Sequence, residues 1–324
     1  MSYRLLVYNP GTGDVYDYAP IIQDVSYTTN RTGSPGKLEF TYIQKSPINM
    51  SEGARVQFYA DGREIFSGYV FVTEQDRWGQ ISVTAYDQIR YLKAGASYCF
   101  VGKKLGEIIQ QIAADMQLQT GDIEDTGYVI PTLTKEDTEC LDIIEYALQL
   151  TQYHTGKTFV FYDDFGRLCL KEAKNLMSDI VIGNGSLLTD YTFKSDIDSD
   201  TYNQVKLVRP NKETGKGDTY VFKDSETIKK WGLLQKYEKV DENLNEAQIN
   251  EQGTTMMAYY DRVLKSLTVE AMGVPGLRAG AMSQFMIKDI AELSGGYVLL
   301  LEKVSHKYSN DSHTMKVEAR VLTI

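Results

Sequence analysis

The sequence predicts a mainly β protein with an α/β linker, that is, an α+β chain in which two related β domains flank a small unit of helices and hairpins. Three observations predict this: short alternating segments bounded by turn residues, a central change to helical period, and one pattern written twice. The repeated pattern is GARVQF at residues 53–58 and GAMSQF at residues 280–285. With 324 residues, 42% hydrophobic and 24% charged, the chain has room for two or three domains.

The first hundred residues have the strand period. Residues 38–42 and 56–59 alternate apolar and polar side chains, and Asp61-Gly62 is a strong hairpin-turn dipeptide. Residues 69–73 are expected to pair with 81–85 across the turn at 76–79. Strands at roughly 10-residue spacing favour a barrel or a sandwich, so we expect residues 1–95 to form a first β-barrel domain.

The period then becomes helical. One apolar stripe predicts a first helix: Leu105, Ile108, Ile109, Ile112, Ala113 and Met116. A second helix is expected to start near Thr134, with Asp137 completing a capping box, and to stop at Gly156. Its apolar stripe is Cys140, Leu141, Ile144, Ala147 and Leu148. Residues 158–162 and 167–171 then read as strands, so residues 96–180 are expected to form a small α/β linker domain.

The last part returns to strand period but is interrupted. Residues 187–194 and 204–208 are typical of strands, whereas 211–244 are polar and charged. Residues 246–266 carry apolar side chains at helical spacing, with Gly253 as a weak point. We expect residues 181–324 to form a second β-barrel domain with a polar and helical insertion near 210–266.

The repeat extends beyond the opening motif. The matched segments keep the same order in both copies: 21–27 with 187–193, 38–40 with either 205–207 or 267–269, 53–58 with 280–285, 68–70 with 296–298, and 81–85 with 315–319. A glycine beside a strand marks a bulge or a close backbone approach, which both copies would need at the same place. A trimer of a chain with two related β domains would present six similar domains around one axis.

The composition excludes several classes of protein. A formal charge of −10 argues against a surface that coats nucleic acid. The N-terminus carries no signal-peptide pattern and no segment approaches the length of a membrane span, so we expect synthesis in a cytoplasm and no membrane insertion. Cys99, Cys140 and Cys169 are an odd number at irregular spacing, which fits neither a disulfide framework nor a zinc pattern.

Candidate catalytic groups are few and isolated. His154, His306 and His313 lack a second ligand at helical metal-binding spacing. Cys140 with His154 would suggest a thiol hydrolase, but Cys140 falls on the apolar face of a helix, where cysteine is usually core.

The acidic and glycine-rich motifs are equally incomplete. The spacing of Asp196, Asp198 and Asp200 resembles a calcium loop but lacks its glycine and its final glutamate, so a solvated turn is expected. Asp163-Asp164 fits a hairpin tip better than paired catalytic carboxylates, and 183–185 lacks the features of a phosphate loop. We therefore predict no enzyme activity, no catalytic, cofactor-binding or metal-binding residue, and no cofactor.

The 23 tyrosines are unusual for this length, and tyrosine is enriched at interfaces. Tyr86, Tyr91, Tyr259 and Tyr260 are candidate contacts between subunits, with packing inside the chain as an equal alternative.

The segment from Asp61 to Val70 (DGREIFSGYV), followed by residues 81–92 (ISVTAYDQIRYL), resembles the baseplate hub proteins of contractile phage tails. The resemblance is strongest to the hub family of PBSX-like defective prophages and related R-type bacteriocins, the XkdQ/YqbQ group. Residues 273–280 (GVPGLRAG) are similar to a third motif of that family. The resemblance covers most of the chain in order, although 211–244 matches nothing in the pattern.

The resemblance implies two tail-tube-like β-barrel domains in a homotrimer, a structural hub that joins the hexameric tail tube to the trimeric central spike. It implies further contacts with LysM-type and wedge proteins of the baseplate and with the tape measure protein. It places the chain in the baseplate of a phage tail or contractile bacteriocin, assembled in the bacterial cytoplasm and released by lysis.

Two alternative functions remain at this point. One is a cell-wall-hydrolysing or wall-binding protein of the tail tip, which would need an acidic or metal-bound catalytic site. The other is a stand-alone carbohydrate-binding β protein, which would need exposed aromatic platforms, yet Trp78 and Trp231 are the only tryptophans.

Overall fold

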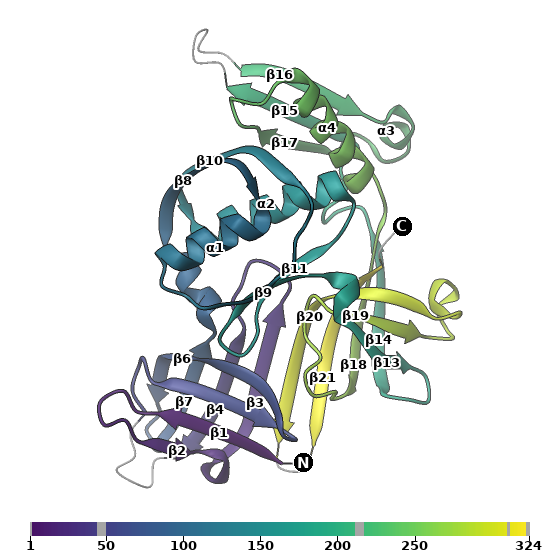
Figure 1. Ribbon diagram of the computed structural model, residues 1–324. Coiled ribbons are helices and arrows are strands. Elements are labelled where there is room, and N and C mark those ends of the chain that lie inside the picture. The colour runs from purple at the N-terminus through teal and green to yellow at the C-terminus, as the bar shows by residue number, and fades with distance from the viewer. Residues whose placement is uncertain (1, 44–49, 211–216, 310–311, 322–324) are drawn as a thin grey trace.

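The computed structural model describes residues 2–43, 50–210, 217–309 and 312–321. Figure 1 shows three tiers: the strands of both ends of the chain lie together, helices α1 and α2 lie in a middle tier, and a small sheet with α4 forms the far tier. The strands follow from alternation; in β4, for example, Leu38, Phe40 and Tyr42 are buried while the residues between them are not.

Within the residues described, the first β unit contains seven strands: β1 (Tyr3–Tyr8), β2 (Val15–Asp17), β3 (Ile22–Asn30), β4 (Lys37–Ile43), β5 (Arg55–Ala60), β6 (Arg63–Gln75) and β7 (Gln80–Tyr86). The described part of the second β unit contains six: β13 (Met177–Gly183), β14 (Leu188–Asp196), β18 (Leu264–Met272), β19 (Met282–Met286), β20 (Tyr297–Ser309) and β21 (His313–Val321). Each unit has its own hydrophobic core.

The two units share one order of strand pairing. In the first unit the order is β3-β4-β7-β6-β5, and in the second it is β14-β18-β21-β20-β19. Gly53 and Gly280, which open the repeated motif, both have positive φ, at 81° and 87°. This left-handed conformation favours glycine, which explains why both copies keep it.

The strand registers test the matched segments one by one. Leu38 lies opposite Ala85, and Leu267 lies opposite Ala319, so 267–269 and not 205–207 is the counterpart of 38–40. The same registers confirm 81–85 with 315–319, and they confirm 21–27 with 187–193.

The match of 68–70 with 296–298 is wrong. Gly68 lies opposite Val56, whereas the residue opposite Ser283, the counterpart of Val56, is Leu299. Gly68 allows close approach, because an added Cβ would lie 2.2 Å from the Tyr86 carbonyl oxygen, while Gly296 has positive φ before β20 begins. The two glycines therefore serve different purposes at different positions.

The pairing path through the described residues is open and runs through both units as one 13-stranded sheet. The two units meet where β20 pairs with β3. In the described part of the chain β14 ends the path on one side and β2 on the other, and neither unit closes on itself by strand pairing. At one position the units differ, because β1 is antiparallel to β5 whereas β13 is parallel to β19.

The middle unit contains two helices, α1 (Leu105–Asp115) and α2 (Cys140–Thr155), and five strands: β8 (Gly95–Lys104), β9 (Thr120–Ile123), β10 (Val129–Glu139), β11 (Phe159–Asp163) and β12 (Leu168–Glu172). Five of the six residues of the first predicted stripe are buried in α1, and the sixth, Met116, is the partly exposed residue that caps its C-terminal end. Gly156 ends α2 with φ 67°, as predicted.

The predicted start of the second helix near Thr134 is wrong. Residues 129–139 form β10, which pairs with β8, and Thr134 lies opposite Cys99. Asp137 is not a helix cap: it has φ 46° and sits where the register shifts, which is the geometry of a bulge. Pairing with a strand thirty residues earlier outweighs the local capping pattern.

The insertion between β14 and β18 folds as a separate small layer. It contains β15 (Gln204–Pro210), β16 (Gly217–Lys223), α3 (Ser225–Trp231), β17 (Gln235–Lys239) and α4 (Glu246–Tyr260). Asn245 caps α4 in a reciprocal box with Gln248. The helix ends before the predicted residue 266, because the chain from Leu264 pairs with β14. Part of the predicted polar stretch, 211–216, lies outside the described residues.

Gly253, which appeared to be a weak point, is required for packing. An added Cβ would lie 2.1 Å from the ring of Phe222, so the glycine lets α4 approach β16 closely. In the part of the chain that is described, no helix combines the length and the hydropathy needed to cross a membrane.

Candidate assembly site at the junction of the β units

The two β units join through seven residue pairs between β20 and β3, from Lys303 opposite Asn30 to Ser309 opposite Asp24. Thr28 Oγ1 donates a hydrogen bond to Ser305 Oγ at 3.1 Å across the two strands. Tyr308 extends from β20 into the core of the first unit, where its ring lies 5.0 Å from that of Phe58. The second unit therefore completes the first.

Three charged side chains lie together at one end of this junction. Arg31 Nε lies 2.7 Å from Glu302 Oε2, and Arg320 Nε lies 3.2 Å from Glu302 Oε1. The arginine side chains are only 11% and 13% exposed, so this triad is screened from solvent far more than a surface ion pair. The backbone N–H of Arg31 also donates to the carbonyl oxygen of Glu302 at 2.9 Å.

A buried polar cluster fixes the middle unit to both β units. Asp87, just after β7, accepts from the backbone N–H groups of Gly36 and Ile89 at 2.8 and 3.0 Å. Asp163, at the end of β11, accepts from Gln88 Nε2 at 3.0 Å. Arg278, from the loop before β19, donates to the Asp163 carbonyl oxygen at 2.8 Å.

Burial dominates the electrostatics of this cluster. It raises the pKa of Asp163 to about 6, and it raises the pKa of Asp87, to which the charge of Asp163 adds. Asp164, the next residue, is exposed, which confirms that 163–164 is a hairpin tip whose two side chains point apart.

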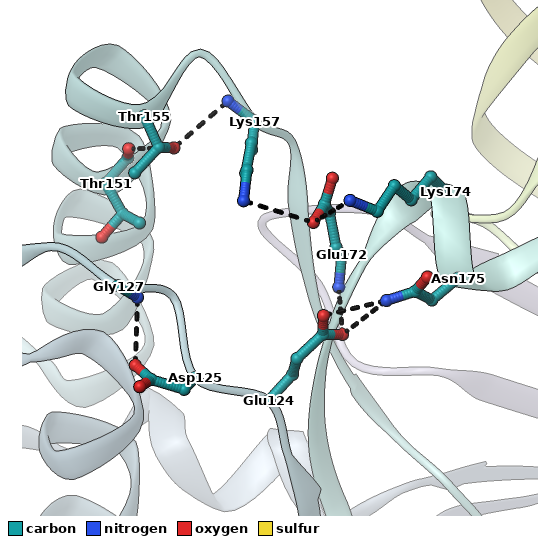
Figure 2. A network of polar contacts seen from close by, with 9 residues as sticks. All are labelled: Glu124, Asp125, Gly127, Thr151, Thr155, Lys157, Glu172, Lys174 and Asn175. Atoms are coloured by element: carbon teal, nitrogen blue, oxygen red, sulfur yellow. Dashed lines mark hydrogen bonds and ion pairs between the residues drawn. The ribbon is translucent and has the colours of Figure 1, made fainter.

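A second polar network leads from the middle unit into β13. Figure 2 shows Glu124 accepting from the backbone N–H of Glu172 at 2.9 Å and from Asn175 Nδ2 at 2.9 Å. Glu172 in turn forms ion pairs with Lys174 at 2.8 Å and Lys157 at 3.8 Å. These contacts fix the short turn between β12 and β13, and so the direction in which the chain enters the second β unit.

Two histidines meet in the hairpin of β20 and β21. His306 Nε2–H donates to the Leu277 carbonyl oxygen at 2.7 Å, so Nδ1 of the same ring is the acceptor for His313 Nε2–H at 2.9 Å. Burial lowers the pKa of both imidazoles to about 4, and the neighbouring His306 contributes to the lower pKa of His313. The sequence pattern did not predict this pair, because the two histidines lie at diagonal positions of a hairpin and not at a helical spacing.

The other candidates for chemistry stay apart. Cys140 and His154 stand at opposite ends of α2, about 21 Å apart at 1.5 Å per residue, and Cys140 is fully buried. Asp196 accepts from the backbone N–H groups of Asp198 and Ser199, which makes 196–200 a turn. Among the described residues no group of three or more His, Cys, Asp or Glu side chains is placed to hold a metal ion.

A cavity of about 310 Å³ lies between the middle unit and the insertion. Tyr128, Leu150, Leu244 and Gln248 contribute to its lining. His154 also lines it, stacked on Tyr128 at 4.4 Å and bonded to Glu251 at 3.3 Å.

The candidate interface tyrosines divide into two groups. Tyr260 is buried and its hydroxyl lies 2.6 Å from that of Tyr153, and the ring of Tyr259 lies 5.6 Å from the same Tyr153 ring, so both pack inside the chain. Tyr86 and Tyr91 are partly exposed and both rings lie 5.6 Å from that of Phe71. Tyr86 lies at the end of β7 and Tyr91 in the short helix Gln88–Lys93, and both pack against Phe71 of β6.

The fold and the repeated pairing define the class of protein. A tail protein from Neisseria meningitidis MC58 has the same fold, with a TM-score of 0.72 and 12% identity over 99% of this chain and 97% of that chain. The chain therefore belongs to the fold class of this tail protein.

The family model described as YQBQ-like matches residues 25–320, and the chain belongs to that family. Two proteins of Bacillus subtilis (strain 168) are similar over 306 residues. Uncharacterized protein YqbQ is 32% identical over 92% of this chain and 91% of its own length, and phage-like element PBSX protein XkdQ is 30% identical over 92% of each. The resemblance seen in the sequence is confirmed at the level of the family.

Proposed function

We propose that this chain is the structural hub of the baseplate in a contractile phage tail or contractile bacteriocin. In this role three copies form an adaptor between the hexameric tail tube and the trimeric central spike. The chain is a scaffold in this proposal, not a catalyst, and it works in the particle that is assembled in the bacterial cytoplasm and released by lysis.

The observation that carries the proposal is the repeated order β3-β4-β7-β6-β5 and β14-β18-β21-β20-β19 in one chain. Two similar units in each of three chains supply six similar surfaces to a sixfold partner and three to a threefold one. We take 1–95 and 181–324 as the two tube-like barrel domains and 96–180 as the linker domain. Their barrels are completed only in the ring, since the pairing path of the single described chain is open.

The internal contacts support a scaffold. The β20–β3 junction and the buried Asp87–Asp163–Arg278 cluster hold two β units and the middle unit in one arrangement. An adaptor that aligns one ring of subunits with another needs domains held in a fixed arrangement. The candidate catalytic residues, by contrast, are scattered or buried.

The test is the mass of the assembled chain. Native mass spectrometry over a concentration series, with and without the purified spike protein of the same particle, is expected to show trimers in at least one arm. The arm without spike is the matched control for spike-dependent assembly. Stable dimers at every concentration, with or without spike, would refute the hub.

A further inference from the structure

In each β unit one long strand, β6 or β20, extends beyond the shorter strand with which its first residues pair. In the second unit the extended half of β20 pairs with another strand. In β20 the first residues pair with β19, and Lys303–Ser309 then pair with β3 on the same side. In β6 the first residues pair with β5, but among the described residues no strand pairs with Val72–Gln75 on that side. At the other end of the sheet, nine-residue β14 has one described partner, β18.

The repeat states which strand should fill the open half. The bulge between Val70 and Val72 in β6 corresponds to the bulge between Leu301 and Lys303 in β20, so Val72 is the counterpart of Lys303. Tyr27 lies opposite Leu38 and Phe193 lies opposite Leu267, so β14 is the counterpart of β3.

We propose that β14 of a second copy of this chain pairs antiparallel with the open half of β6, in the register that β3 has on β20. The register is Val72 with Asp196, Thr73 with Ser195, Glu74 with Lys194 and Gln75 with Phe193 of the neighbouring copy. The inference rests on the proposed hub and specifies how its copies join. Because each copy carries one open edge of each kind, the contact runs head to tail and can close a ring.

Where the internal β20–β3 junction and the proposed β6–β14 junction differ in residue type, the residues on both strands differ together. Inside the chain Thr28 bonds to Ser305. Their counterparts are Lys194 and Glu74, which are exposed and of opposite charge. Lys194 is 57% exposed and pairs within its own strand with Asp196 at 2.8 Å, so it needs only to turn to meet Glu74.

The second exchange is from charge to apolar surface. The counterparts of Arg31, Glu302 and Arg320 are Ile197, Phe71 and Tyr86. Within one chain Phe71, Tyr86 and Tyr91 already form an aromatic cluster beside Val72, which is 40% exposed. Ile197 of the neighbouring copy would complete this cluster, as Arg31 completes the charged one. If the residues of both junctions are in contact, charged residues that contact one another in the first junction should all be replaced by apolar residues in the second, as they are here.

The junction between copies should be the weaker of the two. Val304 and His306 are buried in the internal junction, whereas their counterparts Thr73 and Gln75 are polar and at least partly exposed. The proposed junction between copies contains four residue pairs and one ion pair, whereas the junction within the chain contains seven residue pairs and a charged triad. We expect association that depends on protein concentration and, through Glu74 and Lys194, on salt.

The experiment is cysteine cross-linking between two single variants, Glu74→Cys and Lys194→Cys, both in a Cys99→Ser background because Cys99 is exposed. Thr28 and Ser305 form a non-hydrogen-bonded pair, since the Arg31 backbone N–H donates to the Glu302 carbonyl oxygen three residues away and the pattern alternates. Side chains of such pairs are closest, which suits a disulfide. The control pairs Glu74→Cys with Ser195→Cys, whose side chains would point to opposite faces.

The expected result is a covalent dimer from the mixture of Glu74→Cys and Lys194→Cys chains, at least tenfold more abundant than in the control mixture. Charge reversal provides a second readout. Glu74→Lys and Lys194→Glu should each lower the associated fraction several-fold, and a mixture of the two variants should recover it.

Failure of this inference can be told apart from failure of the hub. Trimers in native mass spectrometry, with no more cross-linking in the matched mixture than in the control, would overturn the register and leave the hub standing. Dimers alone at all concentrations, with or without spike, would overturn the hub and this contact together.

Discussion

Replacing Tyr308 by alanine should destabilise the first β unit, although Tyr308 belongs to the second. Its ring is fully buried in the first core, beside Phe58 and stacked on His313 at 4.1 Å. A tyrosine buries roughly 150–250 Å², which at about 25 cal/mol per Å² corresponds to about 4–6 kcal/mol. Measured aromatic-to-alanine changes in cores fall at about 3–5 kcal/mol, and we expect a value in that range.

The assay is hydrogen–deuterium exchange read by mass spectrometry, which resolves peptides of the two units separately. A loss of about 3–5 kcal/mol corresponds to roughly 10²- to 5 × 10³-fold faster exchange wherever exchange needs the unit to open. Peptides from β3 and β5 should lose this protection. Tyr297→Ala, on the same strand but half exposed, is the matched control and should change exchange by less than threefold.

A second variant separates packing from polarity. The Tyr308 hydroxyl is buried without a hydrogen-bond partner among the described residues, so Tyr308→Phe should be neutral or slightly stabilising. The prediction is refuted if Tyr308→Ala leaves β3 and β5 as protected as Tyr297→Ala does, or if Tyr308→Phe costs as much as the alanine variant.

Three further predictions concern the polar and packed interior. His306 and His313 have pKa values of about 4 in the fold against about 6.5 unfolded, so the unfolded state binds more protons between these limits. The contribution of these imidazoles to stability should be full above pH 6.5 and fall as the pH drops toward 4, by about 1.4 kcal/mol per imidazole for each pH unit between the two pKa values. Urea unfolding midpoints at pH 7.5 and pH 5 measure this loss. A His306→Gln variant that keeps the full pH dependence would contradict the prediction. Arg278→Ala should cost about 2–3 kcal/mol in urea unfolding, because it leaves the Asp163 carbonyl oxygen and its buried surroundings without their donor; a loss below about 0.5 kcal/mol would show that the cluster does not join the units. Gly253→Ala should lower the free energy of unfolding by about 1–3 kcal/mol, and with it the thermal midpoint, because the added methyl group clashes with an aromatic ring. Gly295→Ala, which has open space around it, should leave the midpoint unchanged; equal changes in the midpoint would refute the close approach.

The sequence predicted the strands and the repeat well, because both rest on local period. Alternation in 38–42 appears in the structure where the pattern placed it. The glycines that open the two GAxxQF segments were expected to mark a bulge or a close approach, and the structure adds that both have positive φ. The start of the second helix failed for a physical reason: Thr134 and Asp137 are good caps in isolation, but pairing with β8 satisfies more backbone groups than one cap can.

The junction of the β units and the buried polar cluster could not be predicted from the local period of the sequence. The β20–β3 junction joins residues about 270 positions apart, and nothing in a local window marks Tyr308 as part of the first core. Asp87, Asp163 and Arg278 come from three segments that only the tertiary fold brings together. The signal for His306 and His313 is their seven-residue separation across a tight turn, which places two side chains on one face of a hairpin.

The late position of β20 in the chain has a consequence for synthesis. The outer edge of β3 is complete as soon as the first thirty residues leave the ribosome, but its partner follows only near residue 309. At about 5–20 residues per second this interval lasts some tens of seconds. During that time the nascent chain displays an unpaired strand and an unfilled aromatic pocket to its neighbours on the same messenger. Crowded translation should therefore favour β3 joining the wrong copy, and slower initiation should raise the yield of correctly folded protein.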